Sequence, residues 1–151
     1  MKDQNYTRSI EIPATASNVF NHINNVSGWW AVNANGQKSE IEGQSAKLND
    51  EFIMRFGDVH YSKQKLVEVV PNKKVVWLVT DSKLNWLEND KTEWTGTKMI
   101  FELSPNGDNT VLTFTHEGLL PGKECYNRCA PSWDMFITER LRNFIVGTIA
   151  V

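Results

Sequence analysis

The longest apolar pattern of the sequence lies over residues 123–151, and it repeats at helical spacing. Its large apolar side chains recur three and four residues apart, at Trp133, Phe136, Ile137, Leu141, Phe144 and Ile145. Such spacing lines one face of a helix, while Asp134, Glu139 and Arg140 fall on the other side. A helix with one strongly apolar face is stable only when that face packs onto another element. Because strand patterns precede it, we predict that this element is a sheet.

The N-terminal quarter of the sequence predicts one strand followed by short helices. Residues 6–12 alternate in polarity, as a half-buried strand does. A helix follows, which Ser17 or Thr15 can cap and which ends at the pair Asn24-Asn25. We predict a second short helix or turn at residues 26–32 and a loop up to residue 38.

The polarity period changes to two from residue 39 onward. Strands are therefore predicted at residues 51–56, 61–70, 75–80, 97–103 and 110–116. Residues 81–96 carry tryptophans among charged residues, and we interpret them as a mobile loop or an irregular hairpin, with Trp86 as a possible lid. Runs of hairpin-joined strands favour an antiparallel sheet with the helices on one side, which is an α+β fold. Residues 1–151 are predicted to form a single domain.

The charge balance excludes some partners. Lys and Arg together number 16, Asp and Glu number 18, and the net charge is −2 without any basic block. Nothing therefore predicts binding to nucleic acid or to an anionic membrane surface. The apolar runs are too short to span a bilayer and the start MKDQNYTRS is not a signal peptide, so we expect a cytoplasmic protein.

Several segments carry a resemblance to a known family. They are SIEIPATASNVFNHI followed by SGWW, VVPNKKVVWLV, TKMIFELSPNGDNTVLTFTHEGL, and the ending ECYNRC with its tryptophan. Together, over residues 6–147, they resemble the START-like (SRPBCC) superfamily, and within it the branch named for the activator of the heat-shock protein 90 ATPase. The resemblance implies a helix-grip fold, in which a curved antiparallel sheet wraps a long C-terminal helix over a hydrophobic cavity. Members of this superfamily range from ligand binders to cyclases and chaperone regulators, so the fold leaves the function open.

Aromatic side chains are the strongest functional signal. A concave apolar space with a few polar groups is the usual form of a small-molecule site. The side chains predicted to line such a space between sheet and helix are Trp29, Trp30, Phe52, Met54, Phe56, Trp77, Phe114, His116, Cys129, Trp133 and Phe136. Orienting polar groups could come from Tyr61, Tyr126, His60, His116 and Arg55, although the alternation of the strand turns Arg55 to solvent. The alternative is that the rings fill a closed core.

Motifs for catalysis are absent from the sequence. It has no phosphate-binding glycine loop, zinc signature, His-Glu-x-x-His or nucleophile elbow, so we predict no cofactor and no metal, and binding rather than catalysis. The candidate catalytic residue is His116, which would point into the cavity from the last strand. An interior histidine is more often a hydrogen-bonded part of the core.

Two cysteines stand near the start of the predicted helix. Cys125 and Cys129 are predicted to be reduced, because four helical residues rise about 6 Å, near the long end of the roughly 4.4–6.8 Å usual for a disulfide. Pro131 lacks the backbone donor that would bond to Asn127 and is expected to kink or break the helix.

Three functions are compatible with these patterns. The first is binding of a small, mostly hydrophobic molecule in the cavity. The second is a cyclase or hydrolase type of enzyme that uses His116. The third, which only the resemblance implies, is a chaperone-activating module that would contact a chaperone.

Overall fold

The computed structural model describes residues 5–31, 33–34 and 37–149 of the chain. The first half contains β1 (Tyr6–Ile12), α1 (Ala16–Asn24), the 3-10 turn η1 (Val26–Gly28), β2 (Asn33–Ala34), β3 (Gln37–Gly43) and β4 (Glu51–Phe56). The second half contains β5 (His60–Val70), β6 (Lys74–Leu84), β7 (Lys98–Asn106), β8 (Asn109–Glu117), α2 (Tyr126–Met135), the π-helical η2 (Phe136–Leu141) and α3 (Arg142–Ile149).

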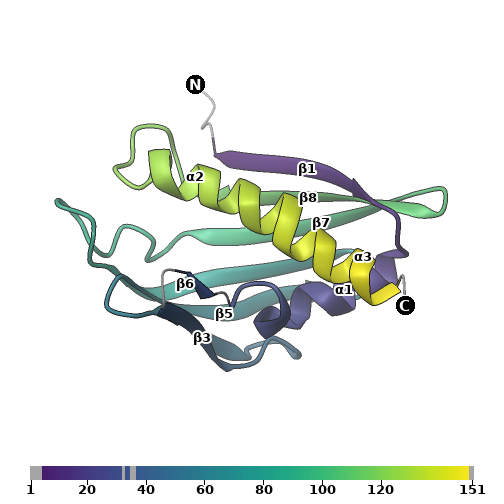
Figure 1. Cartoon of the computed structure of the whole chain (residues 1–151), viewed down its shortest axis with the longest axis horizontal. Coiled ribbons are helices and arrows are strands. Elements are labelled where there is room, and N and C mark those ends of the chain that lie inside the picture. Colours follow the sequence, from purple (N-terminus) through teal and green to yellow (C-terminus); the bar gives the residue numbers. More distant parts are fainter. Residues whose placement is uncertain (1–4, 32, 35–36, 150–151) are drawn as a thin grey trace.

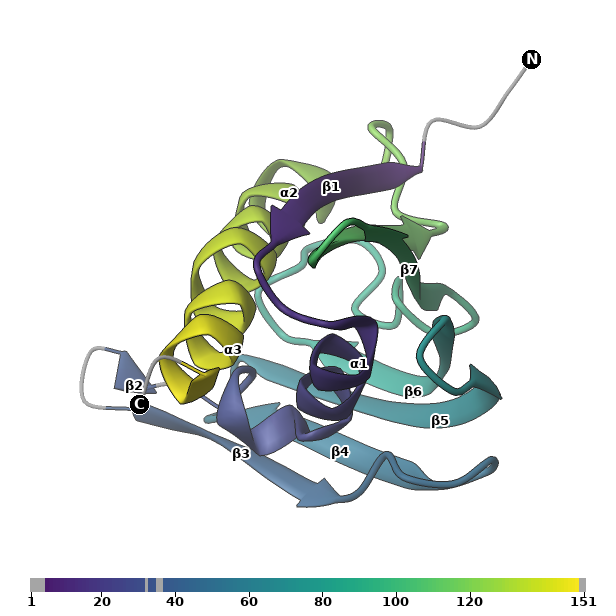
Figure 2. The same cartoon turned by 90° about the vertical axis from the view of Figure 1, so that its right-hand side faces the viewer.

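Across the described residues, the strands form one antiparallel sheet in the order β1-β8-β7-β6-β5-β4-β3-β2. The first strand returns to pair with the last, so that Tyr6 lies opposite His116 and Ile12 lies opposite Thr110. The sheet curves around the rod made by α2, η2 and α3, and α1 covers one end of the space between them (Figures 1 and 2). This arrangement confirms the predicted α+β helix-grip fold.

The strand faces follow the predicted alternation. In β4, Phe52 and Met54 are buried while Glu51 and Arg55 are exposed. The side chain of Arg55 lies on the outer face of the sheet, with its guanidinium over the ring of Tyr61, 4.8 Å from the ring centroid. The apolar face of β4 therefore turns toward the helical rod, as the period of two predicts.

Two segments differ from the sequence prediction. Strand β3 begins at Gln37, so the predicted loop up to residue 38 is partly strand, although residues 35–36 lie outside the described residues. Strand β6 continues to Leu84 instead of ending at residue 80, because its polar end still pairs with β5. Ser82 is buried there and its hydroxyl bonds to the hydroxyl of Thr95 at 2.8 Å. A buried, paired serine is indistinguishable in sequence from a loop serine.

The start of the C-terminal helix also differs from the prediction. It begins at Tyr126 rather than at residue 123, and it passes through Pro131 without a break. Proline removes the hydrogen bond to the carbonyl four residues earlier, which belongs to Asn127. Both residues are exposed, so water can satisfy that carbonyl and the helix continues.

The burial pattern of the rod explains its π-helical segment. Buried side chains occur at every fourth residue, at Cys129, Trp133, Ile137, Leu141 and Ile145. A regular α-helix has about 3.6 residues per turn, so a strict spacing of four drifts around its axis. The i→i+5 bonding of η2 places more residues in a turn and compensates for this drift. The rod thus keeps one line of contact with the sheet.

Gly28 allows α3 to approach η1. A Cβ added to Gly28 would overlap the ring of Phe144, whereas nothing lies within 4 Å of a Cβ added to Gly147. We expect Gly28→Ala to lower the free energy of unfolding by about 1–2 kcal/mol, because the ring must move out of a packed position. Gly147→Ala, in an exposed turn of α3, is expected to raise it by about 0.5–1 kcal/mol. Urea denaturation of the two variants measures both effects. If both substitutions changed the free energy of unfolding in the same direction, the close packing of Phe144 on Gly28 would not limit the residue at this position.

Candidate functional site

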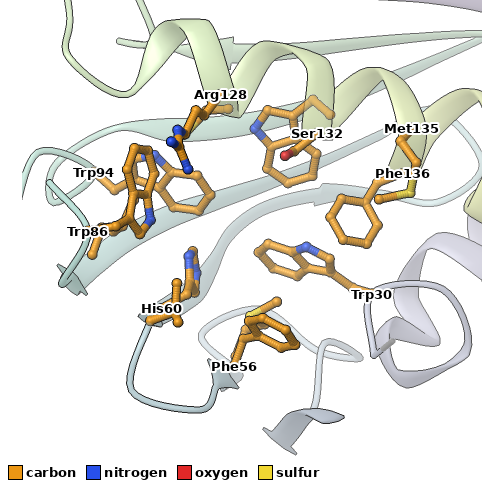
Figure 3. Close-up of a pocket in the computed structure, with 14 residues that line it drawn as sticks. Trp30, Phe56, His60, Trp86, Trp94, Arg128, Ser132, Met135 and Phe136 are labelled. Atoms are coloured by element: carbon orange, nitrogen blue, oxygen red, sulfur yellow. The ribbon is translucent and has the colours of Figure 1, made fainter. Parts of the chain in front are cut away.

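A cavity of about 400 Å³ lies between α2 and the strands β4 to β6. Its described lining residues are Trp30, Met54, Phe56, Val59, His60, Leu84, Trp86, Trp94, Arg128, Cys129, Ser132, Trp133, Met135 and Phe136. Figure 3 shows the α2 side chains facing those of the sheet and of the segment 85–97 across this space. The volume falls in the range of small-molecule sites, about 300–1,000 Å³.

Tryptophan rings form much of the wall. The rings of Trp94 and Trp133 stack with centroids 6.0 Å apart and planes 14° from parallel. On the side of Trp133 away from Trp94 lies Trp30, and the ring centroids of Trp30 and Trp133 are 5.3 Å apart. The indole N–H of Trp94 donates to the sulfur of Cys125 at 3.3 Å, which fixes the orientation of its ring. The wall is therefore aromatic, and contacts within the protein hold its rings in place.

Hydrogen bonds fasten the segment 85–97, which carries two of these rings, to the start of α2. Glu124 accepts from the backbone N–H groups of Glu88 at 2.8 Å and Asn89 at 3.0 Å, and these bonds lower the pKa of its carboxyl group. Glu93 in turn accepts from the backbone N–H of Cys125 at 3.0 Å. The segment predicted as a mobile loop or irregular hairpin is thus a turn-rich connection tied to the helix at several points.

Three polar side chains reach the cavity. The guanidinium of Arg128 lies over the ring of Trp86, 5.5 Å from its centroid. Ser132 follows one helical turn later. His60 donates to or accepts from Ser62 at 2.9 Å, and burial lowers its pKa to about 4, so the imidazole is neutral at pH 7. Among the lining residues that the structure describes, none is Asp or Glu, and Arg128 is the charged one.

His116 lies in the core, next to the cavity but not in its lining. The indole N–H of Trp133 donates to Nδ1 of His116 at 3.0 Å. Since indole nitrogen only donates, the histidine proton sits on Nε2 and is donated to the hydroxyl of Thr97 at 2.8 Å. Burial lowers the pKa of His116 to about 3. Both ring nitrogens are occupied and the ring is neutral, which leaves no free group for acid–base chemistry.

The prediction that the two cysteines are reduced is wrong for this structure, in which Cys125 and Cys129 form a disulfide. Their Cα atoms are 5.5 Å apart, closer than the rise of a regular helix suggested. The first turn is tightened, because the backbone N–H groups of both Arg128 and Cys129 donate to the carbonyl of Cys125, at 2.9 and 2.8 Å. In the described part of the chain, no cluster of three His, Cys, Asp or Glu could hold a metal ion.

The predicted ligand-binding residues divide into two groups. The structure brings Trp30, Met54, Phe56, Cys129, Trp133 and Phe136 to the cavity. It places Trp29, Phe52, Trp77, Phe114 and His116 in the closed core behind it. Trp77 stacks on Trp29 and on Trp30, at 6.2 Å in each case, and donates its indole N–H to Ser45 at 2.9 Å. The closed core and the cavity are therefore both present, side by side.

Sequence reasoning missed other lining residues. They are Val59, Leu84, Trp94, Arg128, Ser132 and Met135, whereas the sequence predicts Trp86 only as a lid and His60 only as an orienting group. Arg128 and Ser132 are four residues apart, which places them on one face of the helix. This spacing is the sequence signal from which their shared place in the lining could be predicted. Of the other predicted orienting groups, Arg55 and Tyr61 border a separate polar depression beside His60.

A curved sheet gripping a helical rod, with an apolar cavity between them, defines the helix-grip class of proteins. The sequence model of the family described as Activator of Hsp90 ATPase homolog 1-like protein matches residues 18–145. The chain belongs to this family, which confirms the resemblance seen in the sequence. No match was found among curated proteins.

Solved structures with the same fold are similar to the chain over nearly its whole length. The Aha1 dimer from Colwellia psychrerythraea has a TM-score of 0.71 at 22% identity, with 93% of this chain and 95% of that chain covered. Protein NE0264 from Nitrosomonas europaea has a TM-score of 0.68 at 15% identity, with 99% and 100% covered. DynU16, a protein of the dynemicin biosynthetic locus, has a TM-score of 0.66 at 14% identity, and 97% of this chain spans 49% of DynU16. In the described part of this chain, no helix is long and apolar enough to cross a membrane.

Proposed function

We propose that the protein binds a small, mostly hydrophobic molecule in the cavity between α2 and the sheet, without changing it chemically. The observation that carries the proposal is the cavity itself, about 400 Å³ in volume and walled by Trp30, Trp86, Trp94 and Trp133. Burying an apolar ligand there favours binding by about 25 cal/mol for each Å² removed from water, before the lost freedom of motion is subtracted. Membership of a helix-grip family supports the same function.

The state of the histidines supports binding rather than catalysis. An acid–base catalyst needs a side chain that can exchange a proton with the ligand in the cavity. His116 is enclosed by Trp133 and Thr97, and His60 is neutral and bonded to Ser62. The cyclase or hydrolase function predicted for His116 therefore has no support in its geometry. Contact with a chaperone stays a prediction from the family resemblance.

The neutral fluorescent dye N-phenyl-1-naphthylamine tests the proposal, because its emission rises in apolar surroundings. We expect saturable binding together with quenching of tryptophan fluorescence. Ser132→Trp places an indole at the mouth of the cavity from an exposed helical position, and we expect it to weaken dye binding at least about tenfold, or roughly 1.4 kcal/mol. Fluorescence titration of wild type and variant measures the change.

Asn143→Trp is the matched control, because Asn143 is an exposed residue of the same rod and does not line the cavity. This variant should bind the dye as the wild type does. If the dye fails to bind the wild type saturably, or binds both variants equally well, the proposed function is wrong.

A further inference from the structure

Arg128 is an unusual residue for a cavity with otherwise apolar walls. It extends from α2 beside Trp86 and Trp94, and Figure 3 shows its guanidinium at the edge of the space that the rings enclose. Within the described residues its side chain forms no ion pair, and its guanidinium stacks over the ring of Trp86. An arginine held by an aromatic ring keeps its charge and all its donors available.

The carboxylate groups of α2 and of the residues just before it have other partners. Glu124 accepts from two backbone N–H groups of the segment 85–97. Asp134, further along α2, accepts from the hydroxyl of Tyr6 and lies 3.8 Å from the guanidinium of Arg8. In the part of the chain that the structure describes, the guanidinium of Arg128 therefore has no carboxylate within ion-pair distance.

The remaining walls favour flat aromatic groups. Trp94 and Trp133 present nearly parallel rings, and Trp30 lies on the far side of Trp133. Aromatic faces attract other rings beyond what their buried area provides. Ser132, one turn from Arg128, adds a hydroxyl donor on the same side of the helix.

We propose that the ligand is a flat aromatic molecule with one acidic group, whose oxyanion is bound by Arg128 and Ser132 while its rings lie among the tryptophans. This inference rests on the proposed function and narrows its ligand class. A guanidinium can bind a carboxylate through two parallel hydrogen bonds, which an ammonium group cannot do. Because burial keeps His60 neutral, Arg128 is the charged side chain in the described lining, and it would select an acidic ligand.

A pair of competitors that differ only in charge tests this inference. With N-phenyl-1-naphthylamine as the reporter of cavity occupancy, 2-naphthoate and the neutral 2-naphthamide are each titrated to displace it. Wild-type protein is expected to bind the naphthoate about tenfold more tightly than the amide, as a charge-assisted hydrogen bond allows. Arg128→Gln should remove this preference, so that naphthoate and naphthamide displace the dye at equal concentrations. Arg128→Lys should retain only part of it, because the charge remains but the paired donors do not.

Arg140→Gln provides the matched control, since it removes the same charge from an exposed position of the rod outside the cavity. It should keep the preference for naphthoate. If dye binds but naphthoate and naphthamide compete equally in the wild type, or if Arg128→Gln retains the preference, the acidic-ligand inference is overturned while the binding function stands. If the dye itself does not bind, the proposed function fails instead.

Discussion

Trp133→Ala is expected to lower the free energy of unfolding by about 3–5 kcal/mol. The ring of Trp133 is 2% exposed and joins the helical rod to the sheet, with its centroid 4.5 Å from that of Phe114 and 5.3 Å from that of Trp30. Its loss would open a void and would also leave Nδ1 of His116 without a donor. An unsatisfied buried polar atom costs about 1–3 kcal/mol, which places the expected value toward the upper end of the range.

Trp133→Phe separates the two contributions, because it keeps an aromatic ring but removes the N–H. We expect a loss of about 1–3 kcal/mol for this variant, most of it from the unpaired histidine nitrogen. Glu139→Ala, at an exposed position of the same rod, is expected to stay within about 0.5 kcal/mol of the wild type. Urea denaturation followed by circular dichroism measures all three. A midpoint of Trp133→Ala equal to that of the wild type would show that the rod does not depend on this ring.

Acidification is the second change with a large expected effect. The folded state holds the pKa of His116 at about 3 and that of His60 at about 4, both lowered by burial. In the unfolded chain both histidines titrate near about 6.5, so the unfolded state binds more protons below that pH. The two neutral histidines therefore contribute their full stabilisation above about pH 6.5. This contribution to the free energy of unfolding decreases as the pH falls toward the folded pKa values. The slope approaches about 1.4 kcal/mol per pH unit for a fully buried histidine.

Between pH 7.5 and pH 5 we expect His116 alone to reduce the free energy of unfolding by about 2 kcal/mol, with a smaller loss from the partly exposed His60. Carboxyl groups ordinarily titrate near about 4, so this interval mainly reports the histidines. His116→Gln should be less stable at every pH but should lose about 2 kcal/mol less on acidification. Urea midpoints at the two pH values give the result, and a wild type equally stable at both would contradict the neutral, buried state of His116.

The elements that alternate or repeat regularly could be predicted from the sequence. The period of two in β4 and the helical spacing that ends at Ile145 reflect burial on one face, which is a local property of the chain. The end of β6 could not be predicted, because Ser82 is polar and is buried only through its bond with Thr95. Partners that lie far apart in sequence leave no periodic signal.

An apolar cavity between the sheet and the helix could be predicted from the sequence, but the full set of residues that line it could not. Trp30 and Trp77 are equally aromatic and equally buried, and only the tertiary arrangement decides that Trp30 lines the cavity while Trp77 lies behind it. Trp94 stands among polar residues in sequence, yet its ring is stacked on Trp133. The disulfide likewise depended on a tightened first turn of α2, which residue spacing alone does not reveal.

The π-helical segment η2 separates the C-terminal rod into two halves with different contacts. An α-helix turns by about 100° per residue. One residue inserted into or deleted from η2 would therefore rotate the side chains of α3 by about 100° around the helix axis. Ile145 would then leave the core, whereas Arg128 and Ser132, which precede η2, would stay at the cavity. The half before η2 lines the cavity, and the half beyond η2 packs in the core. Substitutions at the cavity-lining positions Arg128 and Ser132 are therefore expected to leave the packing of α3 unchanged.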